Sequence, residues 1–140
     1  MGVFDALRVS ATGLQAERTR MDVIAENIAN VETTRSQDGG PYRRRQVVLM
    51  AEQGAGAGAA ERATHTGVRV AEVAADPSPP MRVHNPGHPD ADADGYVLVP
   101  NVSLPTEMAD MVLAARAYEA NAAALRSGRE MIRQALSILA

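Results

Sequence analysis

The chain has 140 residues, and its 14 basic and 17 acidic side chains give a formal net charge of −3, a balance that argues against nucleic-acid binding. All basic residues are arginine and cysteine is absent, which excludes lysine-based phosphate loops, Schiff bases, disulfides, thiol catalysis and thiolate metal sites. Alanine makes up 26 residues and only four are aromatic, so the chain cannot fill a thick hydrophobic core.

Residues 1–31 are predicted to carry a long helix over 3–31. Mostly apolar residues recur at alternating spacings of three and four, the pattern of a coiled-coil seam. The seam positions are Phe4, Leu7, Ala11, Leu14, Arg18, Met21, Ala25 and Ile28. Asparagines and threonines from residue 27 onward compete for backbone hydrogen bonds, so we expect the helix to end near residue 30.

Residues 32–103 are predicted to form a small β-rich insert between two helices. They hold seven of the eight prolines. Runs at 47–50, 68–73 and 96–99 are typical of short strands, and the second alternates apolar with polar residues. The small-residue segment 54–60 joins the first two runs, within a flexible loop expected over 51–66.

Residues 104–140 are predicted to carry a second long helix, over 104–139. Its seam positions are Leu104, Met108, Met111, Ala115, Tyr118, Ala122, Leu125, Arg129, Ile132, Leu136 and Leu139. Ser103 or Thr106 can cap its start, and Pro105 suits the first turn. The periodicity therefore predicts a mainly α fold, with long terminal helices that pair as a coiled coil.

These helices would be about 40 to 55 Å long, too long for a compact globule of this size, so we expect an elongated shape. Each helix also carries a second, weaker apolar line. The positions of this line are Val9, Ala16 and Val23 on the first helix and Ala117, Ala124, Met131 and Ile138 on the second. A simple two-helix hairpin would leave this second line exposed to water.

Two short motifs could bind metal. Asp90, Asp92, Asp94 and Gly95 match the first half of a calcium loop, but position 12 falls on Asn101, where a glutamate is required. His84 and His88 could join nearby carboxylates in a zinc site, although a loop rich in proline and glycine does not hold such ligands ready. For both motifs the favoured interpretation is a solvated turn, so no metal, cofactor or catalytic residue is assigned.

Two other segments also have a simple interpretation. The glycines at 54, 56 and 58 are not flanked by the strand, helix and lysine of a phosphate loop. We interpret this segment as a linker. The arginines at 43–45 could touch phosphate or lipid head groups, but three charges alone would bind weakly. We interpret them as a solvated strand face or as partners in protein–protein salt bridges.

Several stretches carry a family likeness. Residues 10–34 resemble the N-terminal motif shared by the rod and hook proteins of the bacterial flagellum. Residues 39–44, 88–102, 107–111 and 116–121 are similar to the proximal rod proteins in particular, and the likeness covers nearly the whole chain except 51–63. The residues that match the family motif are Asn27, Asn30, Thr33, Thr34, His88, Pro89, Gly95, Tyr96, Asn101, Tyr118 and Asn121.

This resemblance implies a structural protein and not an enzyme, without cofactors. Subunits would stack helically into the hollow rod that transmits torque and passes exported subunits, with the terminal helices coiled along the inner tube. The implied partners are other copies, proximal and distal rod proteins, the junction protein between the rod and the MS ring, and the export gate. The implied assembly interface comprises Phe4, Leu7, Leu14, Met21, Ile28, Met108, Met111, Tyr118, Leu125, Ile132, Leu136 and Leu139.

The resemblance also implies a cellular location and an export route. The chain would lie in the basal-body rod that crosses the periplasm, exported through the flagellar type III apparatus. No apolar run approaches the roughly 18 residues that span a bilayer, and the first residues lack the plan of a secretory signal. We therefore expect no direct membrane insertion and no cleaved signal. The alternatives are a coiled-coil assembly or export adaptor that forms closed oligomers, a calcium- or zinc-binding module and, last, an enzyme.

Overall fold

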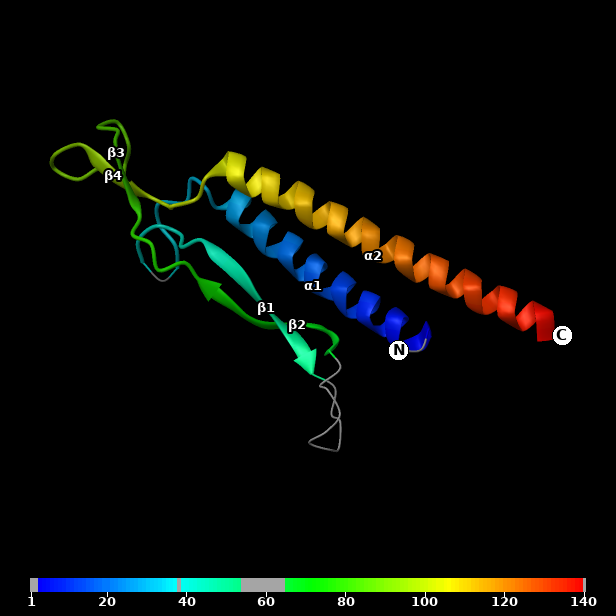
Figure 1. The fold of residues 1–140 in the computed structure, drawn as a ribbon. Coiled ribbons are helices and arrows are strands. Elements are labelled where there is room, and N and C mark those ends of the chain that lie inside the picture. The colour runs from blue at the N-terminus through cyan, green and yellow to red at the C-terminus, as the bar shows by residue number, and fades with distance from the viewer. Residues whose placement is uncertain (1–2, 38, 54–64, 140) are drawn as a thin grey trace.

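The computed structural model of the chain describes residues 3–37, 39–53 and 65–139. Two long helices, α1 (Val3–Ala29) and α2 (Leu104–Leu139), bracket the strands β1 (Arg45–Gln53), β2 (His65–Ala75), β3 (Met81–His84) and β4 (Tyr96–Val99). Figure 1 shows the helices antiparallel and side by side, with the β1–β2 ribbon along α1 and the β3–β4 hairpin at one end. The prediction of a mainly helical, elongated chain with a small β-rich insert is confirmed.

Side chains and local hydrogen bonds set the ends of both helices. The amide of Asn30 and its side-chain Nδ2 both donate to the carbonyl of Glu26, at 3.1 and 2.9 Å, and α1 ends one residue earlier, at Ala29. Ser103 is the N-cap of α2, because its carbonyl accepts the first helical bond, from the amide of Glu107, at 2.9 Å. Pro105 then occupies the first turn, where its missing N–H costs nothing.

The strands pair as two antiparallel hairpins. In the ribbon, Val47 lies opposite Val73, and a register shift falls between Val48 and Leu49. Both ribbon strands are longer than predicted, since residues 51–53 belong to β1 and 65–66 to β2. The rest of the expected loop, residues 54–64, lies outside the described part of the chain. Strand β3 was not predicted from the sequence; it pairs with β4 from Met81 opposite Val99 to His84 opposite Tyr96.

The ribbon covers the second apolar line of α1. The hydroxyl of Thr12 accepts a hydrogen bond from the amide of Val68 at 3.1 Å. Ala16 and Val23 follow Thr12 by four and eleven positions, so helical periodicity places them on this same face, and both are buried. The α1 part of the line that a bare two-helix hairpin would expose is therefore covered, with α2 and the ribbon on different sides of α1. On α2 the line stays open, since Met131 and Ile138 are exposed.

The α2 face that meets α1 lies beside the predicted seam. It is a heptad-spaced stripe of polar and small residues: Glu107, Ala114, Asn121 and Gly128. Glu107 and Ala114 are fully buried. Gly128 leaves no room for a side chain, because a side-chain carbon there would lie 2.6 Å from Cδ2 of Leu7. Small residues let the two backbones approach closely, and this advantage is invisible to a pattern based on apolar side chains.

The predicted seam residues are distributed between half-buried and exposed positions. On α1, Phe4 is 76% exposed. The half-buried members are Leu7, Leu14, Met21, Ile28, Met111, Leu125 and Ile132. The exposed large members on α2 are Leu104, Met108, Tyr118 and Leu136. The side chain of Leu139 lies outside the described residues. None of the described helices has an apolar stretch long enough to cross a membrane.

Candidate functional site: a buried polar junction

A buried polar junction forms where α1 ends, β1 begins and α2 begins. Its centre is Asn27, which is 1% exposed. The Asn27 amide nitrogen donates to Oε2 of Glu107 at 3.0 Å and to the carbonyl of Arg45 at 2.9 Å. Its oxygen accepts from the Arg45 amide and from the Tyr42 hydroxyl, both at 2.9 Å. All four hydrogen-bonding positions of this side chain are thus filled, by Tyr42, by the backbone of Arg45 and by Glu107.

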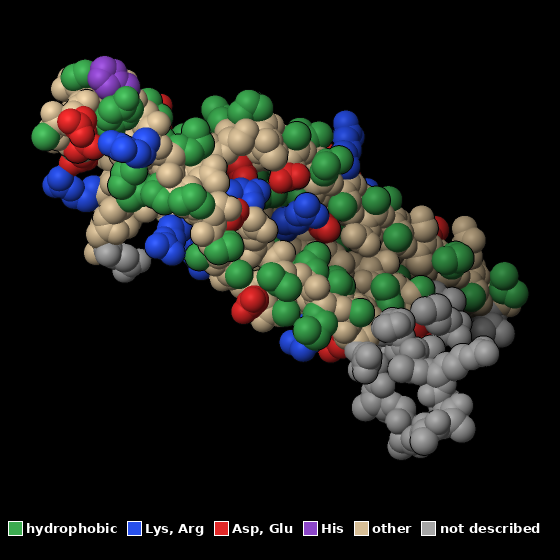
Figure 2. Space-filling view, turned by 60° about the vertical axis from the view of Figure 1, so that its left-hand side comes forward, with side chains coloured by type: hydrophobic (Ala, Val, Ile, Leu, Met, Phe, Trp, Pro, Cys, Tyr) green, Lys and Arg blue, Asp and Glu red, His purple; other side chains and the backbone are tan. Residues whose placement is uncertain are grey.

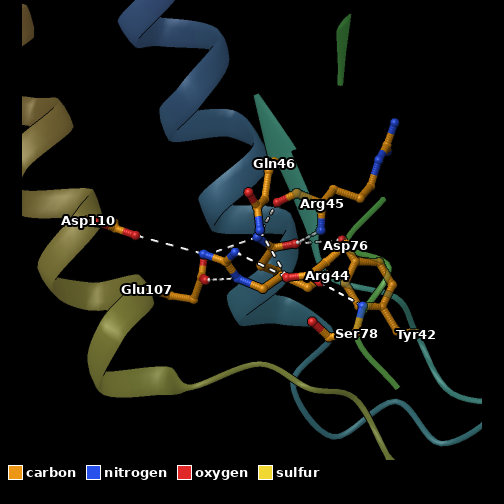
Figure 3. Close-up of polar contacts among 9 residues, drawn as sticks. Tyr42, Arg44, Arg45, Gln46, Asp76, Ser78, Glu107 and Asp110 are labelled. Atoms are coloured by element: carbon orange, nitrogen blue, oxygen red, sulfur yellow. Dashed lines mark hydrogen bonds and ion pairs between the residues drawn. The ribbon is translucent and has the colours of Figure 1, made fainter. Parts of the chain in front are cut away.

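Arg44 connects α2 to the end of the ribbon (Figure 3). Its Nε donates to Oε1 of Glu107 at 2.6 Å, while its terminal nitrogens lie 3.7 Å from Asp76 and 3.8 Å from Asp110. Because Glu107 is fully buried, its charge needs this partner, and removing one member of such a pair leaves an uncompensated buried charge. One guanidinium thus joins β1 to the end of β2 and to two turns of α2.

Asp76 closes the ribbon just beyond β2. Its amide donates to the carbonyl of Arg44 at 2.7 Å, and its carboxylate accepts from Gln46 at 2.9 Å and from the amide of Ser78 at 2.8 Å. These hydrogen bonds, those from Ser78 above all, and the nearby Arg44 hold the pKa of Asp76 below its usual value. On the other side of the junction, burial above all raises the pKa of Tyr42.

A cavity of about 350 Å³ borders the junction. Its walls combine apolar side chains of α1 and β1, among them Val23 and Leu49, with Arg20, Glu107 and Asp110. The Glu107 carboxylate is taken up by Arg44 and Asn27. No nucleophile stands beside a general base in this lining. The arrangement is suited to holding three segments in fixed positions.

The aspartate turn at 90–95 is held by its own backbone. Oδ1 of Asp92 accepts from the amides of Asp94 at 3.0 Å and Tyr96 at 2.8 Å, and Oδ2 accepts from Arg82 at 3.0 Å. The Tyr96 amide bond is the main factor that lowers the pKa of Asp92. Gly95 takes a φ of 77°, a conformation that favours glycine. Asp92 therefore acts as a turn cap.

Asp90 ties this turn to the segment after α1. Its carboxylate accepts from the hydroxyl of Thr34 at 2.8 Å and is paired with the guanidinium of Arg35. His88 accepts the amide of Asp90 at its Nδ1, at 3.1 Å, while His84 packs edge-on against Tyr96. Within the described ranges, no group of three His, Asp or Glu residues could hold a metal ion. The geometry gives the calcium and zinc alternatives no support.

The other motif residues lie in four places. Near the end of α1, Thr33 donates from its hydroxyl to Oδ1 of Asn30 at 3.2 Å. Asn101 lines a cavity of about 230 Å³ beside the junction. On α2, Asn121 faces Gly13 of α1, and Tyr118 is 37% exposed. Pro89 is exposed in the turn. The motif thus serves helix ends, the junction and the turn.

Sequence reasoning missed the central pair of the junction. Arg44 belongs to the run interpreted from the sequence as a solvated strand face or as partners in protein–protein salt bridges, and for Glu107 the sequence predicts a place early in the second helix but no contact with Arg44. The available signal was an arginine at the start of one strand together with a glutamate in the first turn of a helix. Nothing in the spacing indicated that these residues, 63 positions apart, would meet.

Comparison with known proteins identifies related chains. The family model "Flagella basal body rod protein" matches residues 7–36, and the model "Flagellar basal body rod FlgEFG protein C-terminal" matches residues 93–138. The flagellar basal-body rod protein FlgC of Borreliella burgdorferi is 43% identical, over 99% of both chains. FlgC of Bacillus subtilis is 40% identical, again over 99% of both chains, and FlgC of Salmonella typhimurium is 36% identical, over 99% of this chain and 98% of its own. The chain therefore belongs to the FlgC family of flagellar basal-body rod proteins, which are structural subunits of the basal body and not enzymes.

Proposed function

We propose that this chain performs its structural role in the rod by burying the exposed flanks of α2 against neighbouring subunits. The observation that carries the proposal is an asymmetry between the helices. Among the described helices and strands, α1 contacts α2 and both ribbon strands, whereas α2 contacts only α1, apart from the ion pairs of Glu107 and Asp110 with Arg44. The large apolar residues left exposed on α2 are Leu104, Met108, Val112, Leu113, Tyr118, Met131, Leu136 and Ile138.

The energetics support contacts with other subunits. Burying a large apolar side chain is worth roughly 1.5 to 3 kcal/mol, and these side chains gain little of it within one chain. The exposed residues include members of the predicted coiled-coil seam, and seam positions on both helices would meet helices of neighbouring subunits. Because the flanks differ from one another, the contacts are heterologous, the kind that extend into a helical tube.

We infer further that the tube is the hollow drive shaft of the motor. Its neighbours would be proximal and distal rod proteins, the junction protein at the MS ring and the export gate. The chain would travel unfolded through the type III apparatus, without a cleaved signal, to the rod in the periplasm. The absence of cysteine suits such a route, because no disulfide can form on the way.

Met108→Asp tests the proposal. Met108 is 57% exposed and is a seam position, so the variant should fold with a stability within about 0.5 kcal/mol of the parent. Cells that carry it should lack complete rods and fail to swim, because a charge would be buried between subunits. Met108→Leu is the matched control, and cells that carry it should swim normally, because the side chain stays apolar. Normal rods in Met108→Asp cells would contradict the proposed interface.

A further inference from the structure

Strand β1 has one edge without a pairing strand, because among the described strands it pairs only with β2. The hydrogen bonds of the ribbon show which backbone groups point toward this edge. The amide of Asp76 donates to the carbonyl of Arg44, so these two residues form a hydrogen-bonded pair. In an antiparallel ladder, such pairs alternate with pairs whose N–H and C=O groups point outward. Arg45 and Val47 therefore direct their backbone groups away from β2.

The backbone of Leu49 points the same way. The extra residue at the neighbouring register shift, Ala71, belongs to β2, so the alternation along β1 continues past it. Beyond the shift, Ala51 lies opposite Val68, and the Val68 amide leaves the ribbon to meet the Thr12 hydroxyl. This pair is therefore an outward one. Leu49, two residues before Ala51 on the same strand, is outward as well.

A side chain that imitates a strand fills the first outward position. The Asn27 amide nitrogen donates to the carbonyl of Arg45, and the Asn27 oxygen accepts from the Arg45 amide, both at 2.9 Å. These are the two hydrogen bonds that a residue of a pairing strand would make. Among the described residues, no such partner meets the outward groups of Val47 and Leu49. This part of the edge is therefore a template for an extended chain.

The unpaired part of the edge borders the cavity of about 350 Å³ beside the junction, since Val47 and Leu49 both line it. Val23 and Ile24 of α1 give the lining a buried apolar part. Gln46 and Leu49 are exposed, so the cavity is open to solvent. Figure 2 shows basic and acidic side chains gathered among hydrophobic ones near the middle of the molecule, and the cavity lining has this mixed character.

Arg20 adds a charge without a partner to this cavity. Its side chain lines the cavity and is half-buried. The other two basic residues of the lining, Arg44 and Arg45, are paired with Glu107 and Glu26. Within the described part of the chain, Arg20 forms no ion pair. A guanidinium in this state favours a carboxylate from outside the chain, which it can bind with two parallel hydrogen bonds.

We propose that an extended acidic segment of a neighbouring rod subunit pairs with the free edge of β1 in this cavity. The backbone of the segment hydrogen-bonds to Val47 and Leu49, and one of its carboxylates pairs with Arg20. Main-chain bonds supply the affinity of such strand addition, and side-chain contacts supply its specificity. The contact rests on the role of the family as rod subunits, and it is separate from the α2 flanks described above.

NMR titration of the purified full-length protein tests the pairing. The probe is acetyl-Thr-Val-Glu-Val-Thr-amide, a short acidic peptide built from residues that favour strands. It should shift the amide signals of Val47 and Leu49 in a saturable way. Arg20→Gln should weaken binding about tenfold, the effect of losing a charge-assisted hydrogen bond. Absence of a saturable shift at these two amides would overturn the proposal.

Three controls separate strand pairing from capture of an anion. Arg43→Gln should bind the peptide as the parent does, because Arg43 is exposed and lies outside the cavity lining. The same peptide with methylated backbone nitrogens keeps its carboxylate but cannot pair as a strand, so it should not shift the two amides. Sodium acetate should not shift them either. Equal effects of the methylated peptide or of acetate would assign the cavity to a lone carboxylate and overturn the strand pairing.

Val47→Pro tests the edge in cells. Proline removes an N–H that points away from β2, so the ribbon keeps its hydrogen bonds. Cells with this variant should lack complete rods and fail to swim. Val73→Pro is the matched control, because Val73 lies opposite Val47 and loses an N–H on the other edge of the ribbon. Equal rod formation by the two proline variants would overturn the contact.

Two further comparisons keep the tests decisive. If circular dichroism shows that Val47→Pro does not fold, rod formation with Arg20→Gln against Arg43→Gln decides in the same way. Met108→Asp leaves the cavity intact, so the purified variant should bind the peptide as the parent does. Failure of the α2 interface and failure of the edge contact are therefore distinguished, because each has its own variant and its own measurement.

Discussion

Where α1 ends and α2 begins, the two helices meet through a buried amide, a buried carboxylate and a guanidinium. About three turns from the far end of α2, they meet through Leu7 on Gly128, and beyond this contact Ile138 is 84% exposed. The first region satisfies its polar groups within one chain. The second leaves large apolar surface without a partner. The difference teaches that one end of this subunit is completed by folding, whereas the other would be completed by the assembly proposed above.

This division is suited to a subunit that is first a free chain and then part of a polymer. The junction fixes the ribbon and the start of α2 relative to α1 before any neighbour arrives. The distal turns, with few contacts, belong to the low-stability part of the chain, as expected of segments that order on binding. In an isolated chain, substitutions at the junction should therefore change the free energy of unfolding strongly, and substitutions at the distal end should change it little.

The largest effect is expected for Glu107→Ala. The substitution removes the shortest of the three ion pairs of Arg44, whose pairs with Asp76 and Asp110 remain, and it takes one acceptor from the buried Asn27 amide. It should therefore cost roughly 3 kcal/mol, the lower end of the range for a broken buried pair. Total stabilities are about 5 to 15 kcal/mol, so the loss would be a large fraction of the whole. Urea unfolding followed by circular dichroism would measure it.

Two variants define the scale for Glu107→Ala. Asp110→Ala removes a carboxylate 3.8 Å from the same guanidinium but 31% exposed, and it should cost at most about 1 kcal/mol. Phe4→Ala, at the distal end, should change stability by less than about 0.5 kcal/mol, since Phe4 is 76% exposed. If all three variants unfolded at similar urea concentrations, the contrast between the ends would be wrong.

The next effect concerns the docking of the ribbon on α1. Gly67 has a φ of 151°, and a side-chain carbon there would lie 2.4 Å from the Thr12 hydroxyl that binds the Val68 amide. Gly67→Ala should therefore cost roughly 1 to 3 kcal/mol, through strain and overpacking. Hydrogen exchange should show that the amides of β1 and β2 exchange faster, while the amide of Arg45, which donates to Asn27, stays protected.

Gly87→Ala is the matched control for the ribbon. Gly87 has ordinary backbone angles among the described glycines, and a side-chain carbon there would come no closer than 3.8 Å to its neighbour Asn85. We expect no change in exchange within the ribbon. Equal effects of the two substitutions would mean that the close approach of Gly67 to Thr12 does not hold the ribbon.

The sequence predicted the helices well because their signal is local. Heptad spacing, the N-cap Ser103 and the helix end near Asn30 are each read within a few residues, and the structure confirms both helices to within about two residues. β3 was missed because Met81–His84 is four residues long and follows a proline-rich stretch. Its partner β4 lies across a turn whose fold depends on Asp92.

The face of α2 that packs on α1 and the polar junction could not be predicted from such local signals. The close approach at Gly128 and Ala114 depends on small side chains, which an apolar pattern discounts. Arg44 and Glu107 meet only because the ribbon folds back on α1, so their pairing is a property of the tertiary fold. The motif residue Asn27 came from the family likeness, and its role as the centre of the junction came from its four hydrogen bonds.

The smallest effect is expected in the pH dependence of the junction. Hydrogen bonds from Ser78 first, then from Gln46, and the charge of Arg44 lower the pKa of Asp76 below 3.8 in the folded chain. Because the folded value is the lower one, the ionised carboxylate favours folding. Its contribution is complete above the unfolded value and is lost as pH falls through the folded one. Stability should therefore decline on acidification below about pH 4, partly through Asp76.

Asp76→Asn isolates this contribution, because its side-chain oxygen can still accept the Ser78 amide but carries no charge. Urea midpoints measured between about pH 7 and about pH 3 should fall less steeply for the variant than for the parent, and the two curves should converge at the acid end. Parallel curves would show that the charge of Asp76 is not coupled to folding. The junction would then depend on the ion pair between Glu107 and Arg44 and on the hydrogen bonds of Asn27. The part of the molecule that is complete before assembly would be limited to the contact of the two helices with the start of β1.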